Sequence, residues 1–312
     1  MFKYRPLLRR IMGTRILVTG ALGQIGTELV EALAEKYGQG NVIATDVRES
    51  DNCRSLDVMD AEGILSLVED EGITEIYHLA ALLSATGEKN PELCWEINVD
   101  GLENVIAAAR QHGCRLFAPS SIAVFGPDCP SIAPQVTPLN PATVYGKTKV
   151  AGEQLAMTSD VDMRGLRYPG LISYKAPAGG GTTDYAVEIF HAALADGHYT
   201  CFVREDTQLP MMYMDDAIRA TLEIMDVPSE KLGSARGGYN IAGCSFTAGE
   251  LVASIQRHLP EFTCTYVPDI RQKYADSWPD DIEDDVARLE WGWVPKFDLD
   301  AMVDAMFVGL RV

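Results

Sequence analysis

Strand-length apolar runs alternate with helix-length amphipathic stretches through the first half of this 312-residue chain. The first run, residues 15–19, is followed by Ile25, Leu29 and Leu33 at helical spacing. The same pattern predicts strands at 41–46, 75–80, 115–121 and 163–168, and helices around 64–68, over 91–112 and from Tyr145 onward. Such alternation implies a parallel α/β sheet with helices on both faces.

The pattern loosens after Pro169. It predicts a glycine-rich loop at 176–183, helices over 185–195 and 247–258, a helix beginning at Asp215 or Asp216, and a short strand at Tyr239. We therefore expect two domains, residues 14–170 and 171–312. The second should be a smaller, irregular α/β domain that covers a substrate, and its residues 212–242 should return to the first.

Three glycines, Gly20, Gly23 and Gly26, lie between the first predicted strand and the helix after it. In a dinucleotide-binding turn the first glycine permits the bend, the second lets the backbone approach a pyrophosphate, and the third lets helix and strand pack closely. The N–H groups and dipole of the helix N-terminus bind the pyrophosphate. The spacing differs by one residue from G-x-G-x-x-G, so for the glycines alone a structural turn is an equal alternative.

Asp46 strengthens the dinucleotide interpretation. It closes the second predicted strand, twenty residues after Gly26, where a carboxylate binds the ribose hydroxyls of NAD and repels the extra phosphate of NADP. The nearby Arg48 leaves NADP as an alternative. Asp57 is expected beside the adenine or, equally, as the cap of the next helix. The expected cofactor is NAD.

Tyr145 and Lys149 stand one helical turn apart, about two dozen residues after Ser120 and Ser121. A fixed positive charge favours a phenolate and lowers the phenol pKa from its ordinary value of about 10. A lowered pKa suits a general base near neutral pH. Alone, Y-x-x-x-K more often marks a solvated helix face. With the glycines and Asp46, it favours removal of a proton and a hydride from a secondary alcohol.

Composition argues against several partners. The net charge of −19 disfavours nucleic acid and anionic membrane surfaces, and no apolar run approaches the roughly 20 residues that span a bilayer. The seven cysteines are scattered and never form C-x-x-C, so we expect reduced thiols and no structural metal.

The N-terminus is the local exception to this acidity. Residues 1–27 have no acidic residue and five basic ones, Lys3, Arg5, Arg9, Arg10 and Arg15. Such a segment before the first strand resembles an organellar transit peptide, and an inert leader is an equal alternative. Residues 1–13 are therefore expected to be either a mitochondrial targeting segment or the leader of a cytoplasmic protein.

These motifs, with Asp57-Val58, His78-Leu-Ala-Ala81 and Asn98, resemble the extended short-chain dehydrogenase/reductase superfamily in the expected order along nearly the whole chain. The resemblance implies a Rossmann-type doubly wound fold, NAD as cofactor, and a homodimer formed through the helices that carry Asn98 and Tyr145. It makes Tyr145 the catalytic acid/base, while Lys149 holds the ribose and lowers the tyrosine pKa, and Ser121 orients the substrate. His78 is expected in the core. The implied cofactor-binding residues are Gly20, Leu22, Gly23, Gln24, Ile25, Gly26, Asp46, Val47, Asp57, Val58, Leu79, Ala80, Ala81, Asn98, Tyr145, Lys149, Tyr168 and Leu171.

Four segments, 181–190, 209–217, 239–243 and 275–279 with 290–293, resemble the short-chain type of L-threonine 3-dehydrogenase. This resemblance implies oxidation of the threonine 3-hydroxyl by NAD+ to 2-amino-3-oxobutanoate. The loop 179–182 is expected to bind the substrate carboxylate through backbone N–H groups and to act as a lid hinge. For Trp278, a core or interface role is an equal alternative to closing the pocket. The expected substrate-binding residues are Ser84, Ser121, Tyr145, Gly180, Thr182 and Trp278.

Two alternatives remain open. One is a nucleotide-sugar epimerase or dehydratase of the same superfamily, although such enzymes usually carry an Arg-Asp pair where this chain has Met211-Met212. The acidic run at 280–285 also argues against a large polyanionic substrate. The other is a non-catalytic NAD-binding protein, which has no need of Ser121, Tyr145 and Lys149 together.

Overall fold

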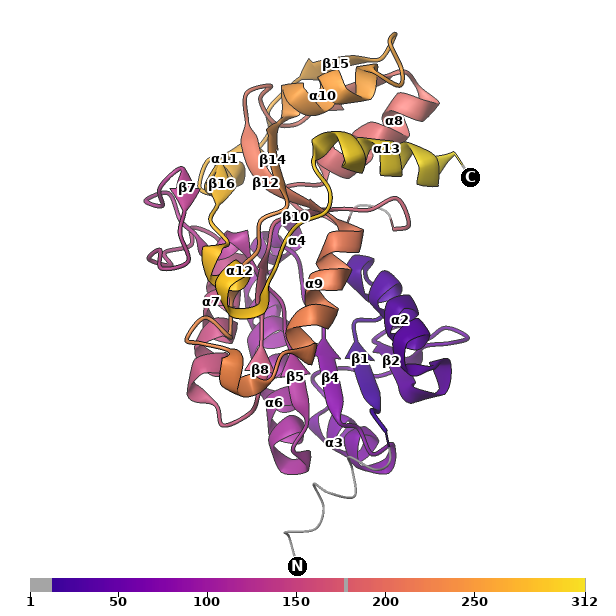
Figure 1. Ribbon diagram of the computed structural model, residues 1–312, viewed down its shortest axis with the longest axis vertical. Coiled ribbons are helices and arrows are strands. Elements are labelled where there is room, and N and C mark those ends of the chain that lie inside the picture. The colour runs from indigo at the N-terminus through magenta and orange to yellow at the C-terminus, as the bar shows by residue number, and fades with distance from the viewer. Residues whose placement is uncertain (1–12, 177–178, 312) are drawn as a thin grey trace, which may run out of the picture.

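The computed structural model describes residues 13–176 and 179–311 of the chain. A six-stranded sheet, in which every neighbouring pair is parallel, occupies the lower half of the molecule in Figure 1. The order runs outward from β1 in both directions, as in doubly wound sheets, which confirms the expected fold class. In spatial order the strands are β3 (Arg54–Ser55), β2 (Val42–Asp46), β1 (Ile16–Thr19), β4 (Glu75–His78), β5 (Arg115–Phe117) and β8 (Met163–Arg164).

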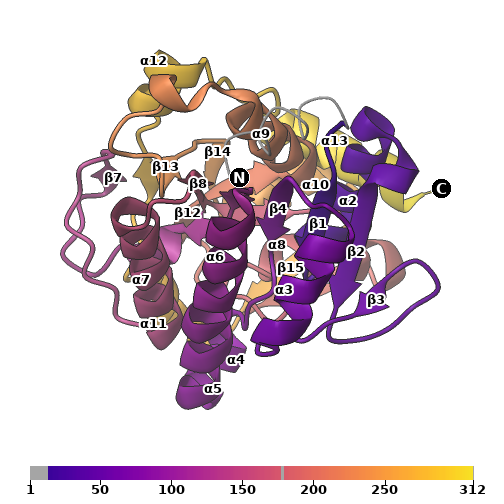
Figure 2. The same cartoon turned by 90° about the horizontal axis from the view of Figure 1, so that it is seen from below.

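The two faces of this sheet enter separate apolar cores because successive strand residues point to opposite sides. Ile16 and Val18 of β1 share one core with α2 (Gln24–Tyr37) and α9 (Met214–Asp226). Leu17 joins the other core, with α3 (Ala61–Asp70), α6 (Gly101–His112) and α7 (Val144–Thr158). Figure 2 shows α3 and α6 side by side. The helix α9 comes from late in the chain but packs beside α2 (Figure 1).

The rest of the chain forms smaller sheets and a third apolar core above the carboxyl ends of the large sheet. The small sheets contain β10 (Gly170–Ile172), β12 (Gln208–Tyr213) and β14 (Cys244–Thr247); β13 (Tyr239–Asn240), β9 (Leu166–Tyr168) and β6 (Ser120–Ser121); β11 (His198–Cys201) and β15 (Thr263–Tyr266); and β16 (Asp281–Ile282) and β7 (Ile132–Ala133). The remaining helices are α4 (Ser84–Lys89), α5 (Pro91–Trp95), α8 (Tyr185–Ala195), α10 (Ala248–Gln256), α11 (Arg271–Ala275), α12 (Asp285–Trp291) and α13 (Leu299–Leu310). Short 3-10 turns lie at Gln39–Asn41, Ile122–Val124 and Ser229–Lys231.

Three predicted elements are interrupted in the structure. The single strand expected over 115–121 divides into β5 and β6, which belong to different sheets. The single helix expected over 91–112 is α5 and α6 joined by a π-helical turn, Glu96–Asp100. The single strand expected over 163–168 divides at Gly165 into β8 and β9, which belong to different sheets. A side chain at Gly165 would overlap the carbonyl oxygen of Gly237, so this position brings two backbones together.

The helix expected to begin at Asp215 or Asp216 begins at Met214, and neither aspartate caps it. Asp216 is buried, and its carboxylate accepts hydrogen bonds from the backbone N–H groups of Lys296 and Phe297 and from Arg219. The aspartate therefore fastens the C-terminal segment to α9.

Arg164 is a buried cation that hydrogen-bonds carbonyl groups at the C-terminal end of α9. It is 0% exposed, pairs with Asp162, and donates to the carbonyl oxygens of Ile224, Met225 and Val227. Arg164→Met would leave the carbonyl oxygens of Ile224 and Val227 without this donor, so we expect the free energy of unfolding to fall by about 3–5 kcal/mol. Urea titration followed by circular dichroism measures this loss. Arg110→Met, which removes an exposed pair with Asp160, should barely move the midpoint; equal losses in both variants would contradict the assignment.

Candidate active site

The glycine turn between β1 and α2 is built for close backbone approach. Gly20 has φ of 69°, and a Cβ there would lie 2.6 Å from the backbone nitrogen of Ala80. A Cβ on Gly26 would overlap the carbonyl oxygen of Gly20. Larger residues at either position would push the turn away from α2 and from the segment after β4.

Helix α2 begins without a side-chain cap, because its N-cap residue is Gly23. By contrast, Asp60, Thr143 and Asp298 cap α3, α7 and α13 with their side chains. The first-turn N–H groups of α2 are therefore left for another acceptor, which fits a pyrophosphate. Gln24 and Ile25 form this first turn.

Asp46 lies at the end of β2, beside the glycine turn, with its side chain buried. One carboxylate oxygen accepts from the Leu22 N–H at 3.1 Å, and the other accepts from the backbone N–H and the Nε of Arg48 at 3.1 and 3.2 Å. Arg48 also donates to the Leu22 carbonyl at 3.2 Å. The neighbouring Val47 is 67% exposed. Asp46 and Arg48 thus stand together where the ribose of a dinucleotide is expected.

Asp57 is exposed and accepts from the Met59 N–H at 2.9 Å. Asp60, three residues later, is the cap of α3, so the capping alternative for Asp57 is wrong. Val58 is buried and packs against Gly101, where a larger residue would collide with it. Of this pair, Asp57 is therefore accessible and Val58 is not.

The segment Leu79, Ala80 and Ala81 follows β4 at the same edge of the sheet and is half-buried. Asn98, in the π-helical turn, donates to the Leu82 carbonyl at 3.0 Å and accepts from the Leu82 N–H at 2.8 Å. Its amide also donates to Thr148 of α7 at 3.1 Å. Asn98 therefore holds this segment in place through its hydrogen bonds to Leu82.

The structure brings Tyr145, Lys149 and Ser121 together. Tyr145 and Lys149 lie on α7, and the Lys149 nitrogen is 5.5 Å from the centre of the tyrosine ring. That nitrogen donates to the carbonyl oxygen of Pro119 at 3.0 Å. The hydroxyl of Ser121 hydrogen-bonds the Tyr145 phenol. One phenol, one ammonium and one hydroxyl thus form a single cluster.

The structure does not show the expected effect of Lys149 on the pKa of the tyrosine. Burial raises the pKa of Tyr145 to about 12, although the hydrogen bond from Ser121 opposes that rise. Burial also lowers the pKa of Lys149 to about 8. The prediction that Lys149 makes this phenol acidic is therefore wrong, because burial of the phenol outweighs the other effects on its pKa. The neighbouring His78 is a buried residue, as expected, and burial lowers its pKa to about 3.

Ser84 and Thr182, both expected to bind substrate, are buried with their hydroxyl oxygens 3.5 Å apart. The expected carboxylate cradle in the same loop is wrong. The N–H groups of Gly180 and Gly181 both donate to the carboxylate of Asp184 at 2.7 Å, so they are already satisfied by an anion. Burial raises the pKa of Asp184 against these hydrogen bonds.

Other expected residues lie deeper in the fold. The buried phenol of Tyr168 is hydrogen-bonded to Thr221, and Leu171 is half-buried on β10 opposite Met212. Trp278 is 9% exposed and packs into the core of the C-terminal part.

The sequence did not predict that Glu88 of α4 lies at the site. Its carboxylate accepts from the backbone N–H groups of Val144 at 2.6 Å and Tyr145 at 3.4 Å, at the start of α7. Since α4 begins at Ser84, this short helix connects the Ser84–Thr182 contact to the helix that carries the tyrosine.

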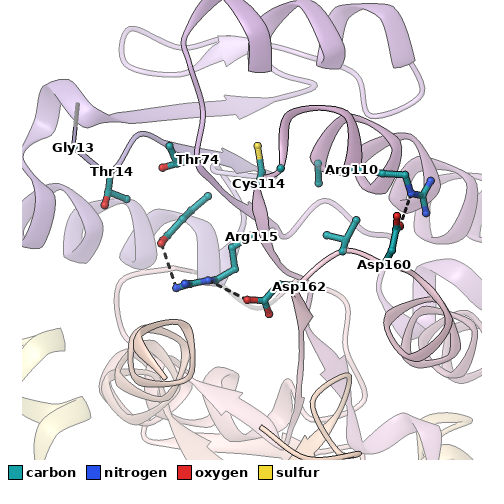
Figure 3. A pocket seen from close by; sticks show the side chains of 12 residues that line it. Gly13, Thr14, Thr74, Arg110, Cys114, Arg115, Asp160 and Asp162 are labelled. Carbon is teal, nitrogen blue, oxygen red and sulfur yellow. Dashed lines mark hydrogen bonds and ion pairs between the residues drawn. The ribbon is translucent and has the colours of Figure 1, made fainter. Parts of the chain in front are cut away.

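A separate cavity of about 500 Å³ lies at the amino end of the sheet (Figure 3). Its cations are already paired: Arg115 with Glu75 and Asp162, and Arg110 with Asp160. Because ligands of open α/β sheets bind at the carboxyl ends of strands, this cavity lies at the opposite end of the sheet from the expected active site.

The chain belongs to the NAD-dependent epimerase/dehydratase family, whose model matches residues 16–242. This confirms the resemblance to extended short-chain dehydrogenases/reductases and the expected cofactor, NAD. An uncharacterized epimerase/dehydratase of Staphylococcus haemolyticus is 47% identical, with 95% of this chain and 98% of that protein covered.

Two solved structures of similar sequence are L-threonine dehydrogenases. A GalE-like L-threonine dehydrogenase from Cupriavidus necator, in its holo form, is 51% identical with a TM-score of 0.92 and covers 95% of this chain and 99% of its own. A monomeric L-threonine 3-dehydrogenase from a metagenome is 53% identical with a TM-score of 0.92 and covers 95% and 98%.

Three further expectations concern membrane spans, metal binding and the N-terminal segment. Within residues 13–176 and 179–311, no helix is long and apolar enough to cross a membrane, and no group of three or more His, Cys, Asp and Glu side chains is placed to hold a metal ion. The targeting segment expected at residues 1–13 lies outside the described residues, apart from Gly13.

Proposed function

We propose that the protein oxidises L-threonine at its 3-hydroxyl with NAD+, giving 2-amino-3-oxobutanoate, as a step of threonine breakdown. One observation carries the proposal: Tyr145, Lys149 and Ser121 form one cluster in a chain about half identical to two L-threonine dehydrogenases over nearly its whole length. The glycine turn and Asp46 support the binding of NAD in the orientation this reaction needs.

In the proposed reaction Tyr145 removes the hydroxyl proton while C3 of threonine loses a hydride. Bound NAD+ would supply the hydride acceptor and a positive charge. Such a charge near the phenol would favour its deprotonated form and lower its pKa from about 12, which would suit Tyr145 to act as the base. Ser121 holds the reacting oxygen in line with the phenol, and Lys149 binds the ribose.

The substrate is proposed to lie between α4 and the loop 179–184. Ser84 and Thr182 offer two hydroxyls from opposite sides. Gly180 shapes the loop, with φ of 92°. In this arrangement residues 14–170 hold the cofactor and 171–312 cover the substrate.

Incubation with NAD+ and L-threonine, followed at the NADH absorbance band, tests the proposal. We expect NADH to form with L-threonine and to require the cofactor. The curated relative is named an epimerase/dehydratase, so nucleotide sugars form the second arm. Conversion of a nucleotide sugar without net NADH, and none of threonine, would replace our proposal with that alternative.

We propose that the protein is a homodimer joined through the face of α5 and α7. Leu93 and Trp95 of α5 are large apolar residues, 45% and 43% exposed, and Met157 of α7 is 45% exposed. Light scattering should give twice the mass of one chain for the native protein. Trp95→Glu should weaken association by roughly 30-fold or more, whereas Val308→Glu, exposed on α13, should not. A monomeric native protein, like the metagenomic relative, would contradict the proposal.

A further inference from the structure

Ser120, the first residue of the Ser-Ser pair, has no part in the reaction proposed above. Its side chain is 5% exposed, and its hydroxyl donates to the carboxylate of Glu153 at 2.6 Å. The residue before it, Pro119, accepts from Lys149 through its carbonyl oxygen. The residue after it is Ser121, which hydrogen-bonds the Tyr145 phenol. Ser120 is thus the middle of a tripeptide whose two ends touch both catalytic groups.

Glu153 is a fixed anchor for this tripeptide. It lies on α7, one turn beyond Lys149, and its residue is 8% exposed. Its two carboxylate oxygens accept from Nε and Nη2 of Arg167, each at 2.8 Å. Such a bidentate pair fixes both distance and orientation.

Arg167 is itself held from two further sides. It is 5% exposed on β9, where it is the register partner of Ser120, and its Nη1 donates at 3.1 Å to the side-chain oxygen of Asn240 and to the Gln135 carbonyl. The network therefore joins the helix that carries the catalytic pair to two strands beside the site. Because all its charges are paired and buried, it has little freedom to shift.

We propose that Ser120, Glu153 and Arg167 form a positioning network that sets the distance between Ser121 and Tyr145. Ser120, Glu153 and Lys149 also line a small cavity of about 20 Å³, roughly the room that one water molecule needs. A misplacement of about 1 Å at a reacting centre can lower a rate by roughly 100-fold. The inference rests on the proposed function, since it assigns these residues to the same tyrosine.

Ser120→Ala tests the inference because it removes one hydroxyl and leaves the Glu153–Arg167 pair intact. We expect kcat for threonine oxidation to fall by roughly 10- to 100-fold while the affinity for NADH stays within about twofold, since no contact of the glycine turn is altered. The ascending limb of the pH–rate profile should move to higher pH, because the hydrogen bond from Ser121 that lowers the pKa of Tyr145 is weakened. Ser120→Thr, which keeps the hydroxyl, should restore most of the rate.

Ser254→Ala is the matched control. Ser254 is a buried serine of α10 that donates to the Asp300 carboxylate at 3.0 Å and accepts from Arg257, so it loses a similar bond outside the site and should keep native kcat. A native rate and pH profile in Ser120→Ala would overturn the inference. So would a fall in kcat accompanied by equal losses of NADH affinity and thermal stability, because the network would then be only structural.

A second readout separates this inference from the proposed function. The titration of Tyr145 can be followed by NMR of protein labelled with 13C-tyrosine, with the signal assigned from Tyr145→Phe. If the native protein oxidises no threonine, the proposed function fails, yet an upward shift of this titration in Ser120→Ala still supports the positioning role. An unchanged titration contradicts that role whatever the substrate is.

Discussion

Tyr145→Phe is expected to lower kcat for threonine oxidation by roughly 1,000-fold, because a positioned acid/base contributes about 100- to 10,000-fold. The hydroxyl is the only group that the variant loses, and the ring that packs near Lys149 remains. The affinity for NADH should therefore stay within about twofold. Steady-state rates and a fluorescence titration with NADH measure both quantities.

Tyr185→Phe is the matched control for this variant. Tyr185 is fully buried on α8, and its hydroxyl has no hydrogen-bond partner among the described residues. Its loss should leave turnover and stability near the native values. A Tyr145→Phe protein that turns over like the control would remove the tyrosine from the proposed mechanism.

Asp46→Ser is expected to shift the preference for NADH over NADPH by roughly 100-fold towards NADPH. The carboxylate repels a 2′-phosphate, and a like-charge contact in a binding site costs several kcal/mol, where 1.4 kcal/mol is a factor of ten. The variant also releases Arg48, whose Nε is now held by Asp46 at 3.2 Å. A freed guanidinium is a good partner for a phosphate group.

The double variant Asp46→Ser/Arg48→Ala separates these two effects. It should lose the repulsion but also the new cation, and so bind NADPH more weakly than the single variant. Binding titrations with the two reduced cofactors suffice, with no need for turnover. If Asp46→Ser binds NADPH no more tightly than the native protein does, the place that we assign to the ribose is wrong.

Much of the fold could be predicted because local patterns and global topology agree. Ile16, Leu17 and Val18 form an uninterrupted apolar run since β1 is buried on both faces. The clustering of Tyr145 with Lys149 follows from helix periodicity alone. The glycine turn is equally local, as its residues are adjacent to both β1 and α2.

What could not be predicted depends on contacts between distant segments. No sequence pattern predicts the π-helical turn at Glu96–Asp100. Nor does any pattern show that the backbone of Gly237 packs directly against Gly165. The role of Asp184 depends on a loop closing on itself, although its place just after Gly180 and Gly181 was a usable signal.

The tyrosine pKa was mispredicted for a similar reason. The spacing of Tyr145 and Lys149 reports their proximity, but it does not report how much solvent the folded chain excludes from the phenol. The position of Glu153 near the site could have been predicted, since it lies four residues after Lys149 on the same face of α7. Its partner Arg167 comes from a strand that sequence patterns do not place beside it.

The most direct measurement of the central claim uses L-threonine carrying deuterium at C3. We predict that the deuterium appears on the nicotinamide ring of the product NADH, detected by mass spectrometry, and that Tyr145→Phe slows this transfer by roughly 1,000-fold. Unlabelled NADH, or no NADH at all from labelled threonine, would contradict the account.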